Sequence, residues 1–132
     1  HQTNVLPVMD RDVTALPHLL ELSQASGDEL SLPRWCLLQR EGKSLYLVQG
    51  EELSNLLSEQ APAEVCDLAE LGLRRWSTAA LPPRCTLQEA MDTLRKQTVE
   101  AIVVTDPNAA PGTSIRGIIT RDIIEQFYLG KI

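Results

Sequence analysis

The chain has 132 residues, of which 43 % are apolar and 23 % are charged, so it fits one domain of ordinary size with a sizeable core. Twelve basic residues against eighteen acidic ones leave a formal charge of −6, which argues against a nucleic-acid partner, because such a partner needs a clustered positive surface. No apolar run approaches the roughly 20 residues that cross a bilayer, and no charged-then-apolar signal peptide opens the chain.

The first half of the chain reads as a strand, a helix, two strands and a second helix. A short β-prone step at residues 13–14 comes first. It is followed by an amphipathic run of leucines, Leu19, Leu20 and Leu22. This run predicts a helix. Apolar strands are expected at residues 35–38 and 45–48, and the second runs directly into a helix over 51–59, so we assign residues 5–60 to the first repeat.

Residues 61–75 are interpreted as the connector between the two halves. Three apolar residues in it, Val65, Leu68 and Ala69, are spaced as one stripe of a helix, and Gly72 fits a C-terminal stop. A short helix is therefore expected between the halves.

The second half, residues 76–130, repeats the order of the first. A β-prone step at residues 77–78 precedes a stripe spaced i, i+3, i+4 and i+7, namely Leu87, Ala90, Met91 and Leu94. Strands at 101–104 and 115–119 and a helix over 121–129 complete it. The order β-α-β-β-α thus occurs twice, which predicts an α+β fold whose two repeats pack through their sheets with pseudo-two-fold symmetry. The residues expected between the sheets are Leu38, Leu47, Val103 and Ile118.

This duplicated pattern resembles a tandem pair of cystathionine-β-synthase (CBS) domains, often called a Bateman module. The resemblance covers nearly the whole chain and is strongest in the second half, where LPPRCTLQEAMDTLRKQTVEAIVVTD is followed by IRGIITRD. The first half is a degenerate copy. Within the family, the pairing of LVQGEELSNLL with GIITRDIIEQFY is most similar to the cytoplasmic C-terminal module of bacterial ClC-type chloride channels and antiporters.

The junction before the last helix carries a polar residue with two interpretations. Thr120 stands at the expected N-cap, where its hydroxyl can accept a backbone hydrogen bond, and Asp122 is placed favourably against the helix dipole. Alternatively, the helix N-terminus offers free N–H groups to a phosphate. In CBS modules that bind adenine nucleotides, the resemblance implies a Ser or Thr here for the phosphate and an aspartate three residues later for the ribose.

The chain departs from that pattern in both repeats. Ile123 stands three residues after Thr120, and a helix turns about 100° per residue, so Asp122 does not substitute for a carboxylate at the next position. The first repeat has other residue types at the equivalent places: Gln49, Glu52 and, in the place of Gly117, Tyr46. The candidate ligand-binding residues are Thr120, Asp122, Thr78, Ala101, Gln49 and Glu52. The ligands that the resemblance implies are AMP, ADP or ATP, bound weakly, and no cofactor is required.

The sequence offers little material for catalysis or metal binding. Only two histidines are present, His1 and His18, so a nucleophilic centre lacks its base. The three cysteines, Cys36, Cys66 and Cys85, are odd in number and widely spaced, which indicates free buried thiols of a reducing compartment. The charged cluster at residues 10–12 is interpreted as a solvated run. We expect no catalytic residue, no metal ligand and no enzymatic activity.

Two functions from different classes remain. In one, an adenine nucleotide in the cleft between the halves biases the conformation of an attached transporter or metabolic enzyme. In the other, the module braces its host as a constitutive dimer, and the degenerate Thr-x-x-Asp positions favour this one. We expect a non-catalytic module of a larger protein, attached to a membrane transporter such as a chloride channel or antiporter, in the cytoplasm at the inner face of the membrane.

The closing helices of the two halves predict an assembly. Each has an apolar face, Leu53, Leu56 and Leu57 in one and Ile123, Ile124 and Phe127 in the other. A unit of this size cannot hide both faces completely, so we expect a two-fold homodimer that buries part of them.

Overall fold

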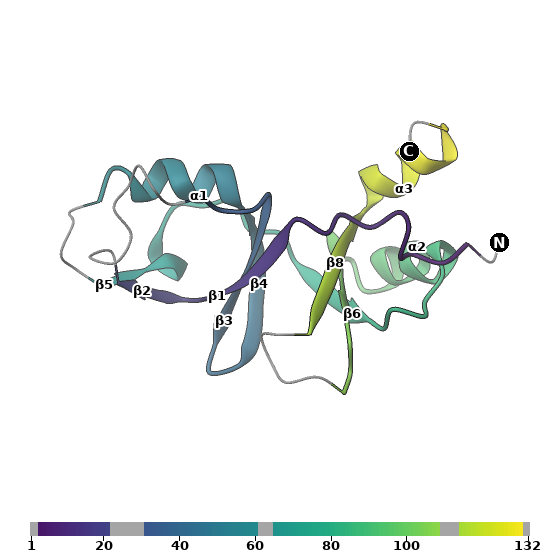
Figure 1. Cartoon of the computed structure of the whole chain (residues 1–132), viewed down its shortest axis with the longest axis horizontal. Helices are drawn as coiled ribbons and strands as arrows, with labels where there is room; N and C mark the ends of the chain where they lie inside the picture. Colours follow the sequence, from purple (N-terminus) through teal and green to yellow (C-terminus); the bar gives the residue numbers. More distant parts are fainter. Residues whose placement is uncertain (1–2, 22–30, 61–64, 109–113, 131–132) are drawn as a thin grey trace.

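The computed structural model of the chain describes residues 3–21, 31–60, 65–108 and 114–130. Its elements are, in chain order, β1 (Val13–Pro17), β2 (Leu19–Glu21), β3 (Trp35–Arg40), β4 (Lys43–Gln49), α1 (Gly50–Leu57), β5 (Val65–Asp67), a 3-10 helix (Leu68–Glu70), β6 (Thr78–Leu81), α2 (Leu87–Lys96), β7 (Ala101–Thr105), β8 (Ile115–Thr120) and α3 (Arg121–Tyr128). Figure 1 shows the two halves side by side along the long axis, with α1 in one half and α2 and α3 in the other.

Each half contains a three-stranded sheet with the same topology. In the first half β1 is parallel to β3 and β3 is antiparallel to β4. In the second half β6 is parallel to β7 and β7 is antiparallel to β8. The antiparallel pair shifts register at the same place in both sheets, after Leu38 and after Val104. The predicted α+β fold of two repeats is confirmed by this shared plan.

The two sheets face each other across one apolar cluster. Its buried members are Trp35, Leu37, Leu47, Ala101, Val103 and Ile118. Leu47, Val103 and Ile118 were predicted for this layer, but the prediction for Leu38 is wrong. Leu38 lies on the other face of β3, in a cluster with Leu53 of α1, because neighbouring residues of a strand point to opposite faces.

The segment after β1 is a strand, so the helix predicted there is wrong. Residues 19–21 form β2, which pairs antiparallel with β5, and Leu22 lies outside the described residues. Leu20 and Cys66 pack in the core of the first half, whereas Leu19 and Val65 are exposed. Leu20 and Leu22 are two residues apart in the sequence, a spacing that fits a strand as well as the helix that was predicted. The backbone pairing with β5 makes the segment a strand.

The helical stripe predicted for the connector is also wrong. Val65 belongs to β5, whereas Leu68 and Ala69 lie in the 3-10 helix. The Asp67 side chain accepts a hydrogen bond from the Ala69 backbone N–H at 3.0 Å. This carboxylate starts a tight turn directly after the strand, so the apolar residues are divided between two elements.

The segments before each half's first strand cross to the other half's sheet. Asp10 exchanges backbone hydrogen bonds of 2.9 and 2.8 Å with Ile118 of β8, and Trp76 exchanges two of 2.9 Å with Leu47 of β4. Three residues of the N-terminal segment are buried in the core of the second half: Val5, Val8 and Met9. Residues 5–9, assigned from the sequence to the first repeat, thus pack with the second.

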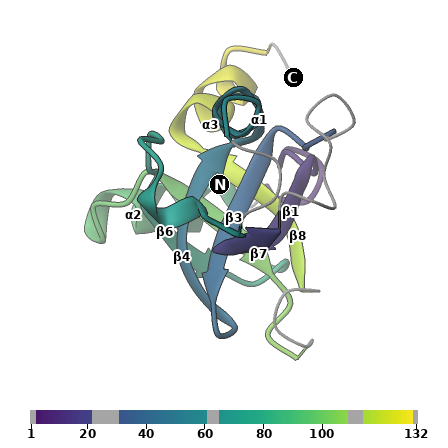
Figure 2. The ribbon, with the colours of Figure 1, turned by 90° about the vertical axis from the view of Figure 1, so that its left-hand side faces the viewer.

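The helices of the second half start at side-chain caps. Thr86 and Glu89 form a capping box at α2, and the predicted stripe of α2 is buried at Leu87, Ala90 and Leu94. Figures 1 and 2, which share a vertical axis, both place α1 and α3 on the same, upper side of the molecule. None of the described helices is long and apolar enough to cross a membrane.

Candidate functional site

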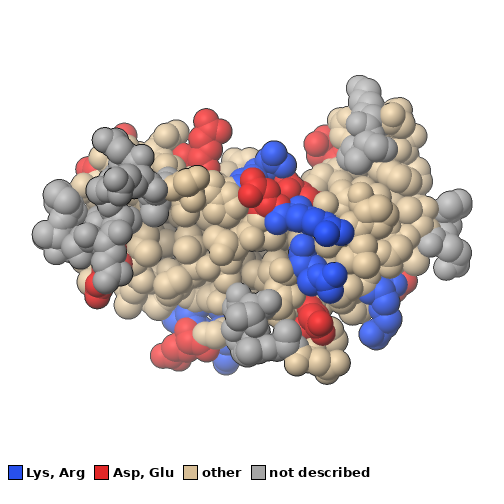
Figure 3. All heavy atoms as spheres, viewed as in Figure 1, with Lys and Arg blue, Asp and Glu red and all other residues tan. Residues whose placement is uncertain are grey.

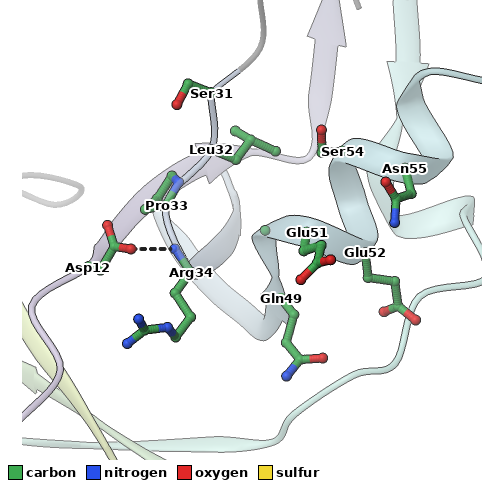
Figure 4. Close-up of a pocket in the computed structure, with 11 residues that line it drawn as sticks. Asp12, Ser31, Leu32, Pro33, Arg34, Gln49, Glu51, Glu52, Ser54 and Asn55 are labelled. Atoms are coloured by element: carbon green, nitrogen blue, oxygen red, sulfur yellow. Dashed lines mark hydrogen bonds between the residues drawn. The ribbon is translucent and has the colours of Figure 1, made fainter. Parts of the chain in front are cut away.

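Two clefts occupy equivalent places in the two halves. The first cleft, of about 800 Å³, lies at the start of α1 and is lined in part by Arg34 and Gln49 (Figure 4). The second cleft, of about 490 Å³, lies at the start of α3 and is lined in part by Glu100 and Thr120. The register relates them, because Trp35 pairs with Gln49 as Ala101 pairs with Thr120. Gln49 therefore corresponds to Thr120, and Arg34 to Glu100.

Thr120 acts as a helix cap in the second cleft. It is 6 % exposed, and its Oγ1 accepts a hydrogen bond from the Ile123 backbone N–H at 3.2 Å. The capping interpretation is thus confirmed, and the hydroxyl already has a partner in the chain. Asp122 lies exposed in the first turn of α3, where its negative charge interacts favourably with the positive end of the helix dipole. Ile123 packs against the core of the second half, so an apolar side chain stands where the resemblance implies a carboxylate for the ribose.

Two polar side chains of the first cleft, Arg34 and Glu52, have hydrogen-bond partners in the chain. Arg34 Nη1 lies 2.6 Å from Asp10 Oδ2, and the Arg34 backbone N–H donates to Asp12 Oδ2 at 3.0 Å (Figure 4). The hydrogen bond from Arg34 to Asp10 raises the pKa of Arg34 above its ordinary value. Glu52 Oε1 accepts from the Arg74 backbone N–H at 2.8 Å. Gln49, at the N-cap of α1, makes no side-chain capping bond.

Acidic side chains outnumber basic ones in the first cleft. Asp12, Glu51 and Glu52 line it with Arg34, whose charge is already paired with Asp10. On the face drawn in Figure 3, basic and acidic side chains lie side by side near the middle of the molecule. The first cleft therefore repels a phosphate more than it attracts one.

The six residues predicted from the sequence do not form one site. Thr120 and Asp122 line the second cleft, Glu52 lines the first, and Gln49 lines both. Thr78 lines a separate pocket of about 350 Å³, together with Thr105 and other residues. Ala101, the remaining candidate, is fully buried between the sheets.

Sequence reasoning missed an aromatic and charged group at the second cleft. Trp35 and Trp76 both line it, with ring centroids 5.0 Å apart in an edge-to-face arrangement. The Arg74 guanidinium lies 3.5 Å from the Trp76 ring centroid and 2.7 Å from Glu100 Oε2. The sequence did give a signal, a pair of arginines directly before a tryptophan, but it does not reveal the distant glutamate.

The three cysteine side chains are buried and fill space in the cores of the two halves. Cys36, Cys66 and Cys85 are free and buried, as predicted. Burial raises the pKa of all three, that of Cys36 to about 11, so the thiolate that would act as a nucleophile or ligand is disfavoured. Among the described residues, no group of three or more His, Cys, Asp and Glu side chains could hold a metal ion.

The charged cluster at residues 10–12 is only partly solvated. Arg11 and Asp12 are exposed, but the Asp10 side chain is 12 % exposed and its backbone pairs with β8. The interpretation as a simple solvated run is therefore wrong for Asp10, because crossing to the other sheet covers it.

Comparison with family models and with curated protein sequences gives no match. Comparison with solved structures does. A CBS domain assigned to a transporter of Clostridium difficile 630 is 20 % identical, with a TM-score of 0.56 over 99 % of this chain and 97 % of that one. The CBS domain of a bacterial CNNM/CorC family Mg²⁺ transporter in complex with ATP is 16 % identical, with a TM-score of 0.58 over 98 % and 89 %.

A third structure, a CBS-domain pair from Klebsiella pneumoniae with bound AMP, is 14 % identical, with a TM-score of 0.54 over 97 % of this chain and 99 % of that one. At these identities the likeness concerns the fold. The match covers nearly the whole chain in each case, and the fold is that of a CBS domain pair.

Proposed function

We propose that the chain is a non-catalytic CBS-pair module that regulates and dimerises a larger membrane transport protein, at the cytoplasmic face of the membrane. The observation that supports the dimer is an exposed apolar surface at the end of α3, and the transporter host is supported by the fold shared with CBS domains of transporters. Tyr128 is 56 % exposed and Leu129 is 67 % exposed, next to the partly buried Phe127. The Phe127 and Tyr128 rings meet edge to face with centroids 5.6 Å apart, and exposed aromatic and aliphatic side chains close together in the chain are typical of protein interfaces.

The position of this surface supports a two-fold homodimer. Leu53, Leu57 and Ile124 are buried inside the chain, so the apolar faces of α1 and α3 are smaller than the sequence predicted. Leu56 on α1 and Ile123 on α3 remain partly exposed. Because α1 and α3 lie on the same side of the molecule (Figures 1 and 2), a second copy can cover both helices at once.

Sedimentation velocity over a concentration series tests the dimer. We expect the parent chain to be a dimer and the double variant Tyr128→Ser/Leu129→Ser to be a monomer. Leu19→Ser is the matched control, because Leu19 is 49 % exposed on β2 and points to the face opposite Leu20, the residue of β2 that packs in the core with α1. This variant should dimerise like the parent. A monomeric parent, or a double variant that still dimerises, would contradict the proposal.

The host protein is proposed from the sequence resemblance. The paired segments in α1 and α3 are most similar to those of ClC-type chloride channels and antiporters, so we propose such a transporter as the host. CBS domains of Mg²⁺ transporters have the same fold, and another transporter is the alternative host. The two hosts differ in the membrane domain attached to the module, which the full-length gene product identifies.

Adenine-nucleotide sensing is the second candidate function. It is favoured by the second cleft, which places Thr120 and Asp122 at the start of α3, and by the ATP and AMP bound to two of the similar structures. Against it stand Ile123 at the ribose position and the absence, within the second cleft's lining, of any basic side chain other than Arg121. We therefore propose weak nucleotide binding or none, and a brace that works without a ligand.

A further inference from the structure

One residue of the connector contacts the walls of both clefts. The Arg74 backbone N–H donates to Glu52 Oε1 at 2.8 Å, and Glu52 lines the first cleft. The Arg74 guanidinium donates to Glu100 Oε2 at 2.7 Å and stacks 3.5 Å from the centroid of Trp76. Glu100 and Trp76 both line the second cleft. The two clefts are therefore joined through the backbone and the side chain of Arg74.

The contact extends from Trp76 into the core. Trp76 meets Trp35 edge to face, and Trp35 is 6 % exposed within the cluster between the sheets. The indole nitrogens of both tryptophans are buried and have no hydrogen-bond partner among the described residues. Packing and the guanidinium of Arg74 thus hold these rings, with no side-chain hydrogen bond of their own to fix them. Of the two rings, Trp76 is the one that Arg74 contacts, so its position is the one sensitive to where Arg74 is held.

The link is weak enough to be broken by a ligand. The Arg74 and Glu100 side chains are 48 % and 43 % exposed, and ion pairs at such exposure contribute little to stability. Glu51 is a neighbour of Glu52 that also lines the first cleft, but its carboxylate makes no bond to Arg74 in the structure. The bond of Arg74 to the wall of the first cleft thus depends on Glu52 and not on negative charge in general.

We propose that Arg74 is a positioning residue that couples the two clefts. An occupant of the first cleft that takes the Glu52 carboxylate away from Arg74 shifts Trp76 and Glu100 in the second cleft, and the reverse also holds. The proposal rests on the proposed function and deepens it, because it gives a regulatory module a route between its two clefts.

Tryptophan fluorescence tests the coupling without any ligand. The chain has two tryptophans, Trp35 and Trp76, so its emission reports on this cluster alone. The measurement is quenching of that emission by acrylamide. Glu52→Ala should raise the quenching constant about twofold, because the Arg74 backbone N–H loses its acceptor and the guanidinium that covers the Trp76 ring is no longer held in place. The control Glu51→Ala should match the parent, and Glu52→Gln, which keeps an acceptor oxygen for the Arg74 N–H, should restore the parent value.

The variant Arg74→Met tests whether Glu52→Ala acts on the tryptophans through the Arg74 side chain or by a local change near Glu52. Methionine keeps the backbone N–H and a long apolar side chain but loses the guanidinium. In this background Glu52→Ala should cause no further change in quenching. The proposal is overturned by a Glu52→Ala variant that quenches like the parent, or by an effect of Glu52→Ala that persists unchanged with Arg74→Met. Because neither a nucleotide nor a second copy takes part, this outcome is independent of the sedimentation result that tests the proposed function.

Discussion

The first and second repeats share their strands but differ at their clefts. The position before the central strand carries Arg34 in the first repeat, paired with Asp10, and Glu100 in the second, paired with Arg74. The signs are reversed, yet each pair joins the segment before a repeat's first strand to the same place in the sheet. Both repeats thus have a salt bridge between the crossing segment and the sheet, with opposite polarity in the two.

The helices that close the two repeats, α1 and α3, also start differently. Thr120 caps α3 with its side chain, whereas Gln49 makes no capping bond at α1. Gly50 opens α1 in a tight place against Pro33, whereas Arg121 opens α3 exposed to solvent. The sheet faces, in contrast, bury equivalent positions in both repeats, because both must fill one shared core. Substitutions at equivalent positions should therefore have similar effects on stability in the shared core and different effects at the helix starts.

The largest effect is expected where the repeats are most alike. Ile118 and Leu47 are equivalent and fully buried between the sheets. Ile118→Asp or Leu47→Asp buries an unpaired charge and should cost more than about 4 kcal/mol, enough to unfold the domain. Far-UV circular dichroism and urea titration measure this. If either variant melted within a degree of the parent chain, the assignment of the shared core face would be wrong.

The next effect separates the two helix starts. A Cβ on Gly50 would overlap the backbone carbonyl of Pro33, which cannot move as a side chain can. Gly50→Ala should therefore cost about 3 kcal/mol, whereas Arg121→Ala, at the equivalent exposed position, should change stability by less than about 0.5 kcal/mol. Equal unfolding free energies for the two variants in urea would show that the first cleft is not closely packed.

A pH effect is expected in the first repeat. Burial raises the pKa of Cys36 to about 11. The folded state then keeps its thiol proton at pH values where the unfolded chain loses it, so stability is fully present below the unfolded pKa and falls as pH rises toward the folded value. At pH 10 the loss should be about 1–2 kcal/mol relative to pH 7. Unfolding of the parent and of Cys36→Ala at both pH values checks this. An equal loss in both proteins would assign the effect to other groups.

The smallest effect concerns the caps. Thr120→Ala should cost about 1 kcal/mol through the lost bond to the Ile123 N–H, and Gln49→Ala should cost nearly nothing. Thermal unfolding of the two variants, scanned under the same conditions, is the measurement. A loss at Gln49 as large as that at Thr120 would mean that both helix starts depend on their side chains.

The sequence predicted the elements whose evidence is local. β3, β4, β7, β8 and the three α-helices lie within one or two residues of their expected bounds, because apolar runs and helical stripes are read directly from the chain. It did not predict that Leu37 and not Leu38 faces the other sheet, because all four residues from Trp35 to Leu38 are buried and no alternation is visible.

Other features needed the tertiary partner. β2 is a strand because β5 pairs with it from more than forty residues away. At the candidate site, the cap of Thr120 was visible as a motif before a helix. The bonds of Arg74 to Glu52 and Glu100 were not, because they join three separate segments and follow no spacing rule.

Nucleotide-induced stabilisation tests most directly the central claim that the module braces its host without a ligand. A ligand with a Kd near 0.1 mM, added at about 1 mM, would stabilise the native state by about 1.4 kcal/mol and raise the melting temperature by about 3–6 °C. We expect AMP, ADP and ATP to give little or no shift with the parent chain, and Ile123→Asp to increase any weak response. A shift above about 5 °C with the parent, lost in Thr120→Ala, would contradict the account and make the second cleft a nucleotide sensor.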